Sequence, residues 1–357
     1  MPNSSETGTR LECCEVVGGR VVVIGDLHIS STFSGQHKNY LLECYEVFER
    51  VLDIVQKEQA SAVVFLGDLA GVNERNIRDR QVLMRFMMFL TMLNKATNGN
   101  VFAVHGNHDC GDFTDFDMLI GLGLIKNPKY IDYYGKKPGE KEKHLEVRFH
   151  LVNYGDENKR LNLTDPEDDA SDVVFGHNEY YIDGVTNWYS AGGDVQLSTL
   201  DNFIGVSMVI SGHIHIPSDE ILYTTMKDGS SIGLFYVGCP TRVSERFNDC
   251  WYFTFGYSVE KEDGEDFWST TYAAKLFGLR PASEVFYPRE DFVDDEENED
   301  ELSERVRESD KLTDIVREIM EGRITSGDLN HQIDVVPGVR QEVKDLAKRY
   351  LELANKS

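Results

Sequence analysis

The chain has 357 residues, of which 41% are hydrophobic and 11% aromatic, and a formal net charge of −26. This composition supports one large domain with a smaller appendage, and the lack of a long apolar run excludes a membrane-spanning helix. Residues 1–10 contain no hydrophobic signal core, and the six cysteines show no Cys-x-x-Cys spacing. We therefore expect a cytoplasmic protein with reduced thiols.

The first part of the chain alternates apolar strands with amphipathic helices. Strands are expected at 21–24, 63–66 and 101–104, where β-branched and aromatic residues run together. Helices are expected at 39–58 and 79–96, where apolar residues recur at helical spacing. This βαβ order predicts a parallel sheet.

From about residue 145 the pattern changes to strands alone. These are expected at 144–152, 172–175, 207–210, 232–237 and 251–257. The predicted fold class is α/β, with two packed mixed β-sheets flanked by helices.

Metal-ligand residues follow five of the predicted strands, and a glycine opens each block. The blocks are Gly25-Asp26-Leu27-His28, Gly67-Asp68, Gly106-Asn107-His108-Asp109, Gly176-His177 and Gly212-His213-Ile214-His215. A single histidine after a strand is more often a packed residue than a ligand. Five blocks in this order are different, because the carboxyl ends of strands meet at one edge of an open sheet. Together they would supply enough carboxylate, amide and imidazole groups for two divalent cations.

The order and content of these blocks resemble the calcineurin-like metallophosphoesterase superfamily, over residues 20–258. The resemblance implies two metal ions that share Asp68. It implies that one ion binds Asp26, His28, Asp68 and His215, and that the other binds Asp68, Asn107, His177 and His213. Mixed nitrogen and oxygen ligands do not select one metal, since they suit Mn²⁺ with iron and zinc as alternatives. The resemblance favours Mn²⁺.

The resemblance also implies a catalytic role for His108, next to the substrate phosphate and the leaving group. An imidazole can protonate a leaving oxygen near neutral pH, and Asp109 is expected to orient it. Two metal ions in such a site would activate a water molecule and neutralise charge on the phosphate.

Three departures separate the chain from the protein Ser/Thr phosphatases of this superfamily. Ile29 follows His28 where those enzymes have glycine, Leu69 follows Asp68 in place of the Asp-Arg-Gly motif, and Asp109 replaces a glutamate.

Other stretches resemble the SbcD-type nuclease subunit of DNA recombination and repair complexes, especially its bacteriophage versions. They are residues 119–125, the Val-Phe-Gly-His-Asn-Glu sequence at 174–179, and Tyr-Val-Gly-Cys-Pro at 236–240, where that family typically has Gly-Ser-Pro.

This resemblance favours a DNA exonuclease or endonuclease subunit that acts with an SMC-like ATPase. The alternatives are a phosphodiesterase or phosphatase for small nucleotides and, least favoured, a non-catalytic acidic scaffold. The net charge of −26 predicts weak DNA binding by this chain alone. The segment 126–148 carries seven bases, four acids and three tyrosines, which suits either a solvated hairpin or a nucleic-acid contact.

Five segments are expected along the chain: a polar tail at 1–18, the catalytic domain at 19–260, a connecting or small accessory segment at 261–290, an acidic linker at 291–308, and a helical element at 309–357. Two apolar-striped helices are predicted in the last segment. They would either fold back on the core or dock on the SMC-like ATPase, and they would also allow a homodimer.

Overall fold

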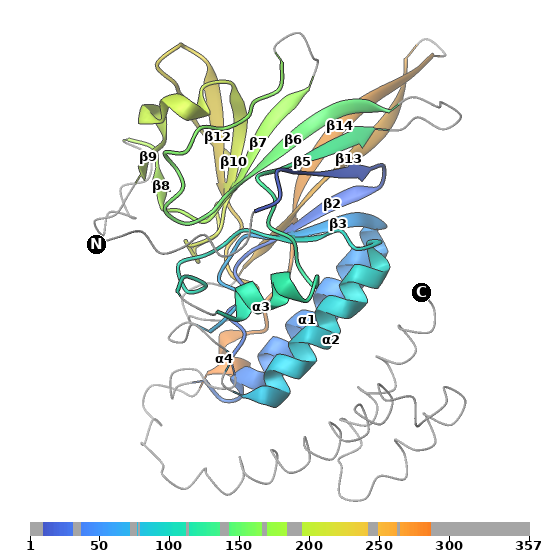
Figure 1. Ribbon diagram of the computed structural model, residues 1–357, viewed down its shortest axis with the longest axis vertical. Coiled ribbons are helices and arrows are strands. Elements are labelled where there is room, and N and C mark those ends of the chain that lie inside the picture. The colour runs from blue at the N-terminus through green and yellow to red at the C-terminus, as the bar shows by residue number, and fades with distance from the viewer. Residues whose placement is uncertain are drawn as a thin grey trace, which may run out of the picture.

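The computed structural model describes residues 10–286 apart from nine short gaps, at 31–36, 72–76, 78, 112–113, 136–142, 166–169, 184–194, 242–248 and 263–264. Two β-sheets pack face to face, and two long helices cover one of them (Figure 1). The predicted fold class, two packed mixed sheets flanked by helices, is therefore confirmed.

The described part of the first sheet has five strands in the order β14-β13-β2-β3-β4. Their bounds are Arg20–Ile24 for β2, Ala60–Phe65 for β3, Val101–Ala103 for β4, Trp251–Glu262 for β13 and Glu265–Leu276 for β14. The three central strands are parallel, as their βαβ order predicted. Along β2, Val21 and Val23 face the second sheet while Val22 and Ile24 face the helices. This alternation explains the unbroken apolar sequence, because both faces of the sheet are buried.

The two long helices begin and end where the apolar pattern predicts. Helix α1 spans Tyr40–Glu58, and helix α2 spans Arg80–Ala96. The side chain of Asn39 accepts a hydrogen bond from the first turn of α1, and Asp79 does the same for α2. These caps satisfy backbone N–H groups that have no partner inside the helix. Phe48 of α1 stacks on Phe89 of α2, with ring centroids 4.5 Å apart.

The described part of the second sheet has seven strands in the order β1-β5-β6-β7-β10-β12-β11. Their bounds are Cys13–Val17 for β1, Tyr130–Gly135 for β5, His144–Val152 for β6, Ser171–Gly176 for β7, Val206–Ser211 for β10, Leu222–Thr225 for β11 and Ser231–Tyr236 for β12. Its outer face is covered by the short strands β8 (Tyr180–Tyr181) and β9 (Val195–Gln196) and the 3₁₀ turns η1 (Leu197–Thr199) and η2 (Asp201–Phe203). Short helices α3 (Asp115–Gly121) and α4 (Ala282–Val285) complete the described elements.

Two predicted segment boundaries differ from the structure. Residues 13–17 of the expected polar tail form β1, which pairs with β5 at the sheet edge. Residues 265–276 of the expected connecting segment form β14, which pairs along its whole length with β13. Phe277 and Val285 are buried as well, so the catalytic domain extends from about β1 to α4.

The acidic linker at 291–308 and the helical element at 309–357 lie outside the described residues. Among the residues that are described, no helix is long and apolar enough to cross a membrane.

Candidate metal centre

The seven predicted metal ligands lie together where the two sheets present the carboxyl ends of their strands. Asp26 and His28 follow β2, Asp68 follows β3, and Asn107 follows β4. His177 follows β7, and His213 and His215 follow β10. The ligand atoms form two groups, Asp26 with His28 and His215, and Asp68 with His177 and His213.

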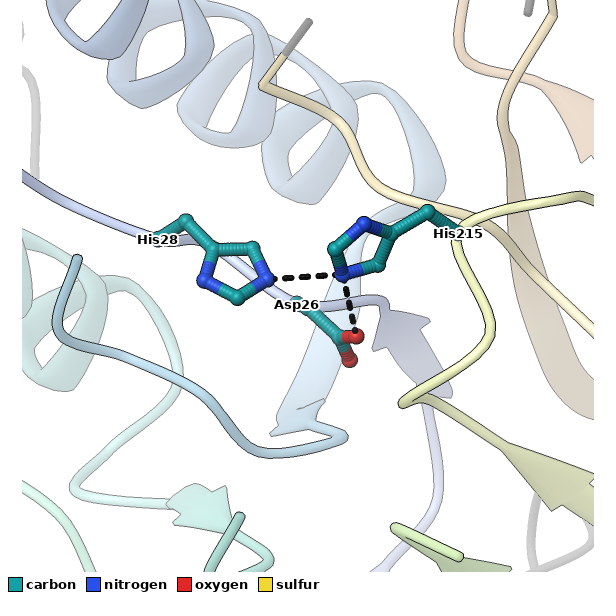
Figure 2. A group of neighbouring side chains, drawn as sticks. All are labelled: Asp26, His28 and His215. Carbon is teal, nitrogen blue, oxygen red and sulfur yellow. Dashed lines mark hydrogen bonds and ion pairs between the residues drawn. The ribbon is translucent and has the colours of Figure 1, made fainter. Parts of the chain in front are cut away.

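The first group consists of two imidazoles and one carboxylate that face one another (Figure 2). Nε2 of His28 lies 2.8 Å from Nε2 of His215, and the latter lies 3.6 Å from Oδ2 of Asp26. His28 and Asp26 are fully buried, and His215 is 26% exposed. Within the described part of the chain, His215 is thus the member of this group that reaches solvent.

The second group adds an amide oxygen to one carboxylate and two imidazoles. Oδ1 of Asn107 lies 3.0 Å from Nε2 of His177 and 3.0 Å from Nδ1 of His213. Oδ2 of Asp68 lies 3.2 Å from Nε2 of His177 and 3.8 Å from Nε2 of His28 in the first group. Asp68 is thus the carboxylate placed between the two groups.

His177 shows the hydrogen-bond pattern of a histidine prepared for a metal. Its Nδ1 lies 2.6 Å from the carbonyl oxygen of Leu66, to which it can only donate. In the neutral imidazole this leaves Nε2 with a free lone pair that faces Asn107 and Asp68. Metal-binding histidines usually donate their other N–H in this way, which fixes the tautomer and the ring orientation.

Three of the site residues hold a backbone conformation that is unusual for residues other than glycine. The φ angle is 47° at His28, 45° at Asp68 and 70° at His213. The backbone N–H of His28 donates to the carbonyl of Asp68 at 2.8 Å, and the N–H of His213 donates to Asp26 Oδ2 at 2.8 Å. Such strain costs about 1–3 kcal/mol per residue and survives where the surroundings enforce it, often at functional sites.

The glycines that open four of the five blocks, at 25, 67, 106 and 212, are required by close packing around the site. A Cβ at Gly212 would collide with the carboxylate of Asp26, and a Cβ at Gly67 would collide with the ring of His177. Gly67 also has a φ of 107°, which is strained for any other residue. The strand-glycine-ligand pattern of the sequence is therefore a consequence of five loops meeting in a small volume.

The charges of the site fit two divalent cations. Asp26 and Asp68 are both buried, and no lysine or arginine among the described residues forms an ion pair with either. Oδ1 of Asp26 and Nδ1 of His28 are buried without a hydrogen-bond partner in the described chain. A buried carboxylate needs compensating charge, and metal ions would supply it.

Burial lowers the pKa of His28 to about 3 and that of His213 to about 4, and neighbouring histidines add to both shifts. Burial also lowers the pKa of His215. Neutral imidazoles are the form that binds metal. Burial opposes a charge on His177 too, but Asp26 and Asp68 outweigh it and raise its pKa. A cation bound beside these carboxylates would displace that proton, because only the neutral imidazole binds metal.

The structure places His108 beside the metal ligands, whereas the carboxylate of Asp109 bonds to backbone groups. Nε2 of His108 lies 4.0 Å from Oδ2 of Asp68, and its side chain is 28% exposed. Asp109 is buried and accepts hydrogen bonds from the backbone N–H groups of Gly106 and Leu69, at 3.0 and 3.1 Å. No hydrogen bond between the side chains of Asp109 and His108 is found among the described residues, and the orienting role expected for Asp109 stays a prediction. The turn directs Asp109 toward the loop after β3, which it ties to the loop after β4.

Two further features of the site were absent from the sequence-based prediction. Cys239 Sγ lies 3.1 Å from the carbonyl oxygen of Asp26, and Thr241 Oγ1 donates to the carbonyl of Leu27 at 2.9 Å, so the 238–241 loop holds the first ligand block. The ring of Tyr154 lies beside the second ligand group, 5.6 Å from the ring of His213 and 6.4 Å from that of His177. The sequence offered only a faint signal for Tyr154, its place two residues beyond a predicted strand.

The chain belongs to the calcineurin-like phosphoesterase family, whose model matches residues 19–217. Members of this family are metal-dependent phosphoester hydrolases with two divalent ions, and the two ligand groups fit that chemistry. No curated protein matches the sequence.

Three solved structures are similar to the chain at low identity. A dimetal phosphatase from Danio rerio is 14% identical, with 67% of this chain and 92% of that chain covered and a TM-score of 0.38. A 5′-nucleotidase precursor from Thermus thermophilus is 13% identical, with 74% and 57% covered and a TM-score of 0.36. Vacuolar Protein Sorting 29 from Cryptosporidium parvum is 15% identical, with 72% and 99% covered and a TM-score of 0.30. Likenesses this loose carry no conclusion about function.

Proposed function

We propose that this protein hydrolyses phosphodiesters, as the nuclease subunit of a DNA recombination or repair complex. The observation that carries the hydrolytic part is the complete ligand set, with Asp68 between the two groups. The DNA substrate is supported by the residues at 119–125, 174–179 and 236–240 that resemble SbcD-type nuclease subunits.

Each residue of the site has a distinct task in this reaction. The seven ligands would hold the metal ions. Their mixed nitrogen and oxygen donors accept Mn²⁺, which the family resemblance favours. When bound, two such ions position a phosphate and neutralise charge on its oxygens. His108 is partly exposed beside Asp68, so its Nε2 can reach a substrate and donate a proton to the leaving oxygen.

A phosphodiesterase for small nucleotides is the second candidate, and the β5–β6 hairpin favours it. Lys129 pairs with Glu12 at 2.7 Å, Arg148 with Asp132 at 2.6 Å, and Lys143 with Glu15. These bases of the segment at 126–148 are thus balanced by acids and are less available for a phosphate backbone. In the nuclease proposal, a partner must then bring the DNA to the site.

One experiment separates the two candidates. Hydrolysis of a small chromogenic phosphodiester, linear duplex DNA and single-stranded DNA would be measured with and without Mn²⁺. The nuclease proposal expects Mn²⁺-dependent cleavage of all three, and the second candidate expects cleavage of the small ester alone. No cleavage of any substrate would contradict both.

The helical element at 309–357 is proposed to dock on an SMC-like ATPase. Its two apolar stripes follow a linker with nine acids and no base between Asp291 and Glu304, and like charges of this density resist packing. Because the described core closes at α4, truncation after residue 290 should leave a folded protein that still binds metal and cleaves a small phosphodiester. It should lose binding to an SMC-like ATPase. A truncated protein that melts far below the full chain would place these helices in the core and contradict the proposal.

A further inference from the structure

Tyr154 is an exposed aromatic residue at the rim of the metal centre. Its side chain is 44% exposed, although its ring lies 5.6 Å from that of the candidate ligand His213. Its hydroxyl makes no hydrogen bond with any residue that the structure describes. The ring thus lies beside the second ligand group and is partly exposed among the described residues.

The backbone at Tyr154 is fixed on both sides by the loops that carry the ligands. Its N–H donates to the carbonyl of His105, two residues before Asn107, at 2.8 Å. The N–H of Gly155 donates to Oδ1 of Asn178, the neighbour of His177, at 3.1 Å.

Asn153 completes this support from the other side of Tyr154. Its Oδ1 accepts hydrogen bonds from the N–H of His105 and from Nδ2 of Asn127, both at 2.9 Å. A partly exposed aromatic ring is therefore held in a defined place beside the site, by hydrogen bonds that three successive residues make.

A ring of this kind suits a flat organic group attached to the phosphate. Aromatic side chains bind nucleobases by stacking, and every base offers a π-face, so the contact does not depend on base identity. Stacking also needs no cationic residue, which matters in a chain with a net charge of −26.

We propose that Tyr154 is a specificity-determining residue that stacks on the base of a nucleoside phosphoester whose phosphate lies at the metal centre. This inference rests on the proposed hydrolytic function and narrows its substrate class to nucleotides and nucleic-acid ends, with single-stranded or unpaired bases within reach of the ring. The neighbouring ligand group positions the phosphate, and Tyr154 distinguishes a nucleoside ester from an ester without a base.

Binding of two matched probes tests the proposal without requiring turnover. The first is the phosphonate analogue of adenosine monophosphate, in which a methylene replaces the 5′ ester oxygen, and the second is methylphosphonate, which has the same head group and no base. Calorimetry with Mn²⁺ gives the ratio of their dissociation constants. We expect the wild type to prefer the nucleoside probe, and Tyr154→Ala to reduce that preference by about tenfold, within the range known for base stacking.

Three variants separate stacking from a structural role. Tyr154→Phe and Tyr154→Trp keep an aromatic face and should retain the preference to within about threefold. Tyr223 is 58% exposed on β11 and has no ring contact with a candidate ligand among the described residues, so Tyr223→Ala is the matched control that should retain the preference in full. An unchanged preference in Tyr154→Ala, an equal loss for both probes, or no preference in the wild type would each overturn the proposal.

Turnover distinguishes failure of this inference from failure of the proposed function. The 4-nitrophenyl ester of thymidine 5′-monophosphate and methyl 4-nitrophenyl phosphate release the same group, with and without a base. Tyr154→Ala should lower the ratio of their kcat/KM values about tenfold, mainly through KM. A protein that binds the phosphonates with a preference that depends on Tyr154 but hydrolyses neither ester would refute the hydrolytic function and leave the stacking role standing.

Discussion

The metal centre and the β5–β6 hairpin both gather charged and aromatic residues, but they balance charge in opposite ways. In the hairpin, Arg148 donates two hydrogen bonds to Asp132, at 2.6 and 3.0 Å, and lies 4.4 Å from the ring centroid of Tyr130. At the metal centre, Asp26 and Asp68 are buried without any lysine or arginine partner in the described chain. Charge that is balanced within the chain stabilises the fold, whereas buried charge that is not balanced marks a place for a ligand.

Removal of the carboxylate shared by the two ligand groups should have the largest effect on the metal centre. Asp68→Asn keeps the shape of the side chain but removes the charge that lies between the two groups. We expect it to abolish phosphodiester hydrolysis and to lower the occupancy of both metal sites, as measured by elemental analysis after dialysis against Mn²⁺. Two full equivalents of metal with unimpaired turnover would refute the assignment of Asp68.

His108 tests whether a residue can act in catalysis at the metal centre without binding the metal ions. His108→Gln is expected to reduce turnover by about 10²-fold, the usual cost of losing a general acid, while both metal equivalents stay bound. The side chain is partly exposed and 4.0 Å from Asp68, so its replacement leaves the ligand shell in place. Loss of metal from this variant would instead make His108 a ligand.

The seven candidate ligands could be located from the sequence because each of them follows a strand within four residues. A buried strand fixes where its last residue lies, and the glycine and ligand after it can then be placed without knowledge of distant contacts. Asp26, Asp68 and His177 all obey this rule. The helices were predictable for a similar reason, since the apolar stripe and the caps at Asn39 and Asp79 are local signals.

What the sequence did not predict depends on contacts between distant residues. Tyr154 reaches the site through hydrogen bonds to loops 49 and 23 positions away in sequence. Asp109 is next to His108 in sequence, but its carboxylate accepts hydrogen bonds from the backbone N–H groups of Gly106 and Leu69. Strands β1 and β14 lie at sheet edges with partly exposed side chains, so neither shows the apolar run of a central strand.

The β5–β6 hairpin can be tested in the complementary way. Its charged residues should affect the stability of the fold and not the hydrolytic reaction. Asp132 is largely buried and its two hydrogen bonds to Arg148 join β5 to β6. Asp132→Asn should lower the free energy of unfolding by about 2 kcal/mol, as for other hydrogen bonds between charged groups. Urea unfolding measures this loss, and metal content should not change.

Lys143 offers a matched control in the same hairpin. Its ion pair with Glu15 is 40% exposed on the lysine side and 53% on the glutamate side. Solvent-exposed ion pairs contribute little to stability, so Lys143→Gln should unfold close to the wild type. A fall in DNA or nucleotide binding in either variant would give the hairpin a binding role and weaken the contrast.

Glu58 at the end of α1 tests whether balanced charge shows in the pH dependence of stability. Burial works against its charge, but hydrogen bonds from Lys275, Tyr252 and Arg20 outweigh burial and lower its pKa below the ordinary value of 4.5. The lowered pKa means that the unfolded chain takes up a proton first on acidification. Its contribution to stability is therefore complete above about pH 4.5 and is lost as the pH falls through the lower, folded value.

Glu58→Gln should thus be less stable than the wild type at pH 6, and the difference should shrink as the pH is lowered toward 3. Urea unfolding across this range in the presence of a chelator measures the difference, and the acids of the metal centre cancel because both proteins carry them. Glu220→Gln, at an exposed position, is the control and should show no such trend. A difference that stays constant with pH would mean that Glu58 contributes through packing and hydrogen bonds that do not depend on its charge. In that case the paired charges of the fold would stabilise it no differently from neutral contacts. The contrast with the metal centre would then rest on the metal centre alone.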